Sequence, residues 1–63
     1  MTNEEIVKTL KAIENYWTKV MNSSYFEYHY LAKGKVIAYR DAIQLLTDSD
    51  YAQHMYDHID YIN

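Results

Sequence analysis

The sequence predicts an all-α protein, in which two long helices pair antiparallel as a hairpin and a shorter third helix follows. Three observations predict this fold. Apolar residues recur at intervals of three and four, two clusters of turn-favouring residues divide the chain into three segments, and proline is absent. Apolar residues at such intervals form one face of an α-helix. We expect residues 1–63 to be a single small helical domain, because a chain this short has room for one core.

The first segment, from about Thr2 to Met21, has the clearest helical pattern. Thr2 and Glu5 have the spacing of a capping box, in which each side chain accepts a hydrogen bond from the other residue's backbone N–H. The turn-favouring residues Asn22, Ser23 and Ser24 end the segment. A narrow apolar seam runs along it, formed by Ile6, Leu10, Ile13, Trp17 and Val20.

The second segment, from about Ser24 to Leu46, permits two interpretations. As a helix, it has a broad apolar face that suits a central helix covered from two sides. As strands, residues 25–31 and 35–39 would form a hairpin around Lys33-Gly34, and the fold would be α+β. We favour a helix, broken or bent at Gly34, because the spacing after Gly34 is helical and a lone hairpin is marginally stable in water. The broad face comprises Tyr28, Leu31, Ala32, Val36, Ala38, Tyr39, Ala42, Ile43, Leu45 and Leu46.

The third helix is expected from about Asp48 to Ile62. The residues Thr47-Asp48-Ser49-Asp50 mark its start, and either Asp48 or Ser49 can cap its first turn. Its apolar seam repeats at intervals of three, four and three, at Ala52, Met55, Ile59 and Ile62.

Residues 25–39 hold more aromatic surface than one helix face can bury. They contain four of the eight tyrosines, the only phenylalanine and the only glycine. A chain of this size buries roughly 60% of the surface that its unfolded form exposes. There is no cysteine to add a disulfide, so self-association is the remaining means of stabilisation. We expect a homo-oligomer, a dimer or larger.

The aromatic strip, defined as Phe26, Tyr30, Lys33, Ile37 and Arg40, is the predicted partner-binding surface. Its apolar members point away from the hairpin if the opposite residues point inward, and charged or polar residues surround them. Such a composition resembles an interface hot spot. Three outcomes stay open: the third helix or a twin subunit covers the strip, a foreign protein covers it, or nothing does. The residues taken to point inward are Leu31, Ala38, Ala42 and Leu46, and the surrounding ones include Asp41 and Gln44.

Two further features have a chemical interpretation. Lys35 falls within the broad apolar face, where its ammonium group either extends to solvent, pairs with a carboxylate or marks a helix break. Asp50, His54 and His58 are candidate metal ligands, because residues four apart share one side of a helix. The sequence lacks the H-E-x-x-H glutamate, and these residues lie away from Met55 and Ile59. We therefore favour a solvated polar face and expect neither a metal nor a cofactor.

Composition argues against several classes of function. Six basic and nine acidic residues give a net charge of −3, which is unlike a protein that binds the phosphate backbone. No apolar run approaches the roughly 20 residues that span a bilayer, and the acidic N-terminus differs from a signal peptide. We expect a cytoplasmic protein with no membrane partner. Without a nucleophilic cysteine or a glycine-rich phosphate loop, we expect no enzyme.

The run from Gly34 to Leu46 reads G-K-x-x-A-Y-x-D-x-x-x-L-L. It resembles a pattern in short helical proteins of bacteria and their phages. The composition, rich in Tyr, Asn, Lys and Ile and free of Pro and Cys, resembles that of proteins from AT-rich phage genes. This resemblance implies a phage or mobile-element accessory protein that binds and blocks or redirects a host protein, as anti-defence inhibitors of restriction or CRISPR systems do. The resemblance does not assign a functional role to any residue of this sequence.

The function predicted from the sequence is therefore a small protein–protein interaction module that inhibits or modulates a host protein in the host cytoplasm. The alternative is a nucleic-acid-linked regulator, either a small DNA-binding helical protein or an acidic decoy of a DNA-binding enzyme. The charge around Lys33 and Arg40 is mixed, which favours contact with protein over direct contact with nucleic acid.

Overall fold

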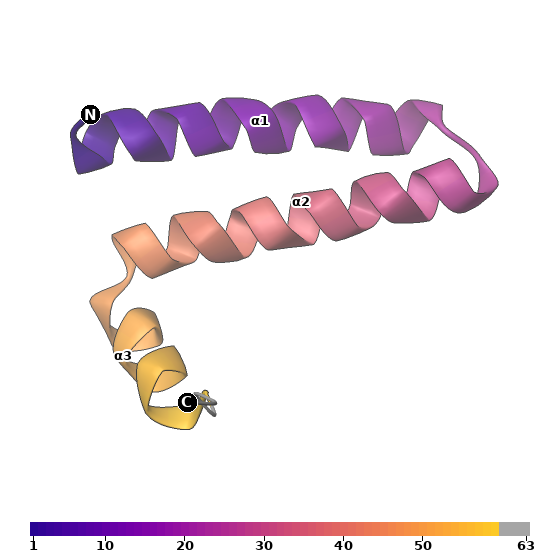
Figure 1. The fold of residues 1–63 in the computed structure, drawn as a ribbon. Helices are drawn as coiled ribbons and strands as arrows, with labels where there is room; N and C mark the ends of the chain where they lie inside the picture. Colours follow the sequence, from indigo (N-terminus) through magenta and orange to yellow (C-terminus); the bar gives the residue numbers. More distant parts are fainter. Residues whose placement is uncertain (60–63) are drawn as a thin grey trace.

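The computed structural model describes residues 1–59, which form three helices: α1 (Asn3–Ser23), α2 (Phe26–Thr47) and α3 (Ser49–His58). Figure 1 shows α1 and α2 side by side and antiparallel, while α3 leaves the end of α2 on the side away from α1. The all-α prediction is confirmed. Residues 1–59 contain no strand, so the alternative α+β fold was wrong. Positions 60–63, including Ile62 of the predicted third seam, lie outside the described residues.

Helix α1 begins as its sequence predicts. The Thr2 hydroxyl accepts a hydrogen bond from the Glu5 N–H at 3.2 Å, and the Glu5 carboxylate accepts one from the Thr2 N–H at 3.2 Å. This reciprocal pair satisfies two N–H groups that the first helical turn leaves unbonded. All five residues of the predicted seam are half-buried, so the seam faces α2 as expected.

Helix α2 runs unbroken through Gly34, so the predicted break there was wrong. Gly34 does not have a positive φ, and its conformation is that of an ordinary helical residue. A helical glycine costs about 1 kcal/mol relative to alanine. The two fully buried side chains of the described chain, Ala32 and Val36, flank Gly34, and their packing against α1 offsets that cost.

The inner face of α2 differs from the predicted one. Ala32 and Val36 are buried, and Tyr39, Ala42 and Ile43 are half-buried. Of the residues expected to point inward, only Ala42 is covered. Leu31, Ala38 and Leu46 are exposed, Leu31 by 51% and Leu46 by 38%. The narrow seam of α1 covers a stripe of similar width on α2. A residue of α2 that is next in sequence to a covered one lies about 100° around the helix, which is beyond the reach of α1.

Helix α3 packs only on the end of α2. Asp48 caps it, with its carboxylate accepting a hydrogen bond from the Tyr51 N–H at 3.1 Å. The Tyr51 hydroxyl reaches the Asp41 carboxylate of α2 at 3.5 Å, and Tyr51, Ala52 and Met55 are half-buried. In the described part of the chain α3 does not approach α1. The helices therefore form an open bundle with a small core.

The open arrangement makes the molecule extended. Its radius of gyration is 13.9 Å, whereas a compact domain of the same length has a value of about 11 Å. Within residues 1–59, no helix has both the length and the apolar character that crossing a membrane requires.

Candidate protein-interaction surface

The aromatic strip occupies a side of α2 that no other helix covers. Its residues are spaced four, three, four and three apart, so they form one stripe along the helix. Helix α1 covers the side that carries Ala32 and Val36, and α3 lies near Asp41. The strip is open: Phe26 is 86%, Tyr30 70% and Ile37 51% exposed. The structure thus places the apolar members of the strip outward, as predicted.

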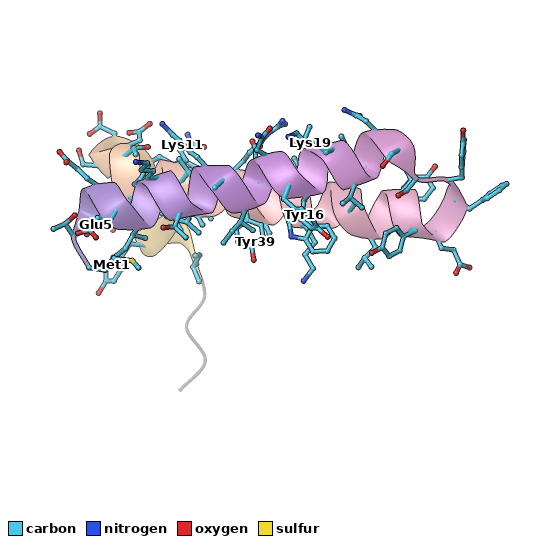
Figure 2. The ribbon with its side chains drawn as sticks, turned by 90° about the horizontal axis from the view of Figure 1, so that it is seen from above. Met1, Glu5, Lys11, Tyr16, Lys19 and Tyr39 are labelled. Atoms are coloured by element: carbon cyan, nitrogen blue, oxygen red, sulfur yellow. The ribbon has the colours of Figure 1, made fainter. Side chains whose placement is uncertain are left out.

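The two edges of the hairpin differ in character. Viewed from above, Lys11 and Lys19 lie along one edge and Tyr16 and Tyr39 along the other (Figure 2). Tyr16 is 58% exposed and its ring packs edge-on against Trp17, with centroids 5.2 Å apart. Tyr16 is therefore an exposed tyrosine that belongs to α1 and not to the strip.

The tip of the hairpin adds a second exposed aromatic residue to the site. Tyr25 is 82% exposed and directly precedes Phe26. Phe26 has φ of 58°, in the left-handed region that bulky residues rarely adopt. Ser24 was expected near the start of α2, but Tyr25 is the N-cap residue and its side chain makes no capping hydrogen bond. The sequence does indicate an exposed aromatic tip, because two adjacent aromatic residues, Tyr25 and Phe26, directly follow the turn-favouring serines.

His29 anchors the strip to α1. Its Nδ1 lies 2.9 Å from the Met21 carbonyl oxygen. The imidazole N–H at Nδ1 therefore donates to a carbonyl of the last turn of α1, which otherwise accepts only a long hydrogen bond from the Ser24 N–H, at 3.5 Å. The His29 ring packs edge-on against Tyr30, with centroids 5.4 Å apart and an angle of 84° between the rings. The half-buried His29 thus links the strip's Tyr30 to the end of the other helix.

Arg40 belongs to the strip by position but is already paired. Its Nε donates to the Glu14 carboxylate of α1 at 2.8 Å, and its side chain is 61% exposed against 21% for Glu14. The hydrogen bond from Arg40 is the main reason that the pKa of Glu14 lies below its ordinary value. Loss of hydration opposes this lowering, while the Thr18 hydroxyl and the charge of Arg40 add to it. Arg40 therefore holds the hairpin together at the rim of the strip.

Lys33 and Lys35 have different surroundings. Lys33 is exposed, and among residues 1–59 it forms no ion pair. Lys35 extends to solvent, with its Nζ 5.9 Å from the centroid of the Trp17 ring on α1. An ammonium group at that distance is attracted to the face of an indole. This contact explains how a lysine is accommodated within the apolar pattern of α2 without a helix break.

The candidate metal ligands do not form a three-ligand site. His54 and His58 lie together, with ring centroids 4.2 Å apart, but His58 Nδ1 is 2.7 Å from the His54 carbonyl oxygen. Nowhere in residues 1–59 do three or more His, Cys, Asp or Glu side chains gather so that they could hold a metal ion. Asp50 is therefore not brought into a site with the two histidines.

No family model, characterised protein or solved structure matches this sequence. The function must therefore be inferred from the chain's own surface. The feature that stands out is the aromatic strip together with the exposed tip.

Proposed function

We propose that this chain is a small interaction protein that binds another protein through the aromatic strip of α2. One observation carries the proposal: the strip exposes Phe26 by 86%, Tyr30 by 70% and Ile37 by 51%, while only Ala32 and Val36 are buried among the described residues. Contiguous exposed apolar surface of this kind marks interaction sites in soluble proteins. Aromatic and arginine side chains also dominate the energetics of protein interfaces.

The contribution of each part of the strip follows from its surroundings. Phe26 projects from the tip, where it can enter a pocket of the partner as a buried anchor. Tyr30 is held by His29, so little side-chain freedom is lost when it binds. Lys33 and Arg40 lie at the rim, where charges affect the rate of association and the choice of partner more than the affinity.

The proposed action is steric. The protein occupies a surface of a host protein and so inhibits or modulates it, without a catalytic step or a cofactor. This is the mode of action that the resemblance to short phage proteins implies. We also propose that the chain forms homo-oligomers, since the strip and the open side of α3 leave apolar surface for a second copy.

The proposal is tested with a tagged protein used to capture partners from a lysate of the source cell. A captured protein is then purified, and its affinity is measured against the wild type, Phe26→Ala and Tyr30→Ala. We expect each variant to bind at least tenfold more weakly, because hot-spot truncations typically cost 2 kcal/mol or more, of order thirtyfold in affinity. Circular dichroism should show unchanged helicity, since both side chains are exposed.

The matched control is Tyr16→Ala, which removes a similarly exposed tyrosine from α1. It should leave the affinity unchanged. Capture that survives both strip substitutions, or capture that depends on nucleic acid and disappears after nuclease treatment, contradicts the proposal. The second of these outcomes would instead support the nucleic-acid-linked alternative.

A further inference from the structure

The chain exposes more surface than a compact monomer of its mass. A folded monomer of 7.6 kDa is expected to expose about 4,300 Å², whereas this chain exposes 5327 Å². The excess of about 1,000 Å² is close to the roughly 800 Å² that each partner contributes to an interface of standard size. One interface on each copy would therefore bring the chain to the exposure of an ordinary folded protein.

The open side of α2 is also complementary to itself in charge. Lys33 and Asp41 lie four residues before and four residues after Ile37. If two copies of α2 cross antiparallel with a two-fold axis at Ile37, Lys33 of each copy lies opposite Asp41 of the other. Within residues 1–59 neither side chain forms an ion pair, and both are exposed. The Asp41 carboxylate accepts only a long hydrogen bond from the Tyr51 hydroxyl of α3, at 3.5 Å. A symmetric dimer forms both of these pairs at once.

Other antiparallel registers fit less well. An axis at residue 30 would pair Glu27 with Lys33, but it would leave Ile37 outside the contact. A register that pairs Glu27 with Arg40 would compete with Glu14, which Arg40 already contacts at 2.8 Å. With the axis at Ile37, the two α2 helices lie side by side along their full length. This register also leaves the ion pair between Arg40 and Glu14 intact.

Small side chains beside the axis permit a close approach. A Cβ atom built on Gly34 would meet nothing within 4 Å, and Ala38 is exposed. Neither residue packs against α1, so their small size has no use within the hairpin. They flank the proposed axis on one side, about 60° and 100° around the helix from Ile37, where their small size leaves room for side chains of the second copy.

We propose that a second copy of this chain covers the centre of the aromatic strip, in an antiparallel α2–α2 dimer with Ile37 on the two-fold axis and Lys33–Asp41 pairs on both sides. This inference rests on the proposed function, because it identifies one occupant of the same surface. In this dimer the tips, with Tyr25 and Phe26, lie at opposite ends. In this register residue 26 falls opposite residue 48 of the other copy, so each tip lies at the end of the contact, where a different protein can reach it from beyond the dimer. Each dimer presents two such tips.

The register is tested by exchanging charges, with the oligomeric state measured by sedimentation equilibrium and native mass spectrometry at low ionic strength. The wild type should be a dimer of about 15 kDa, twice the 7.6 kDa of the chain. Lys33→Glu alone and Asp41→Lys alone should each raise the dimer dissociation constant roughly tenfold or more, since two attractive pairs become two repulsive ones. An equimolar mixture of the two variants should form heterodimers, because both pairs then have opposite charges again.

The double variant K33E/D41K should dimerise about as well as the wild type, for the same reason. Lys11→Glu makes the same charge change on the edge of α1 and should leave the dimer unaffected. A wild type that is monomeric refutes the dimer. A dimer that is insensitive to both single charge changes, or whose variants do not form heterodimers when mixed, refutes this face and register.

Failure of this inference can be told apart from failure of the proposed function. A monomeric protein that still loses its partner on Phe26→Ala would refute the dimer alone. A dimer that responds to the charge exchange but binds no protein through Phe26 would refute the foreign partner alone.

Discussion

At the scale of single residues, Phe26 is unusual in two ways: its backbone φ is positive, and its aromatic side chain is exposed. A bulky L-residue with φ of 58° is disfavoured by roughly 1–2 kcal/mol. A side chain that is 86% exposed gains little packing energy within the chain to offset this cost. Strain that is retained without local compensation often marks a functional position.

Replacing Phe26 with glycine should therefore separate stability from binding. Glycine adopts positive φ at no steric cost, so we expect Phe26→Gly to raise the free energy of unfolding by about 1 kcal/mol while it abolishes the aromatic anchor. Urea denaturation measures the first effect and titration against a captured partner the second. Tyr25→Gly is the control, because Tyr25 has φ of −121° and gains nothing from glycine. A destabilised Phe26→Gly protein would show that the side chain supports the fold.

The Glu14–Arg40 pair gives the hairpin a defined dependence on pH. The hydrogen bond from Arg40 holds the pKa of Glu14 below its ordinary value of 4.5. A carboxylate whose pKa is lowered by folding stabilises the fold above the unfolded-state pKa, and this contribution is lost as the pH falls through the folded-state pKa. Glu14→Gln should thus be less stable than the wild type at pH 7, and this difference in the free energy of unfolding should be smaller at pH 3. Equal differences at the two pH values would contradict this assignment.

At the scale of helices, the contact between His29 and α1 closes the hairpin. The His29 imidazole satisfies the Met21 carbonyl at 2.9 Å, and loss of such a hydrogen bond typically costs about 1 kcal/mol. We expect His29→Ala to lower the free energy of unfolding by this amount, as measured by urea denaturation of the dilute protein. Glu27→Ala changes an exposed residue of the same helical turn and should have a smaller effect. An equal loss in both variants would contradict a specific role for this hydrogen bond, since alanine has a higher helix propensity than either residue that it replaces.

The sequence was sufficient to predict those structural features that depend on residues close together in the chain. The capping box of Thr2 and Glu5, the seam of α1 and the Asp48 cap of α3 each depend on residues a few positions apart, and the structure has all of them. The inner face of α2 was predicted only in part. Its pattern is apolar on more than one side, so periodicity could not tell which side α1 would take.

Two features of the site depend on tertiary contacts that no spacing reveals. Arg40 was predicted only as a charged residue of the partner-binding surface, and the sequence did not indicate that Glu14, 26 positions earlier, pairs with it. The sequence left the environment of the Lys35 ammonium group undecided, and the structure shows this group near the ring of Trp17 on the facing helix. The strained φ of Phe26 likewise has no signature in the sequence, since nothing there distinguishes it from an ordinary first residue of a helix.

At the scale of the whole molecule, the open arrangement of the helices sets the stability. Only two residues of the described chain are fully buried, and small single cores seldom supply more than 3–5 kcal/mol. If association covers the remaining apolar surface, folding and binding are linked by mass action. The thermal midpoint should then rise by several degrees for each tenfold increase in protein concentration, as followed by circular dichroism. In Ile37→Asp, which places two carboxylates at the proposed axis, the midpoint should not depend on concentration.

The most direct test of the central claim, that another molecule covers the open side of α2, is the mass of the purified protein in solution. Sedimentation equilibrium of the wild type at micromolar concentration should give about 15 kDa, and Ile37→Asp should give the 7.6 kDa of one chain with its helicity intact. A wild type of 7.6 kDa at every concentration, with no protein that binds it through Phe26 or Tyr30, would contradict the claim.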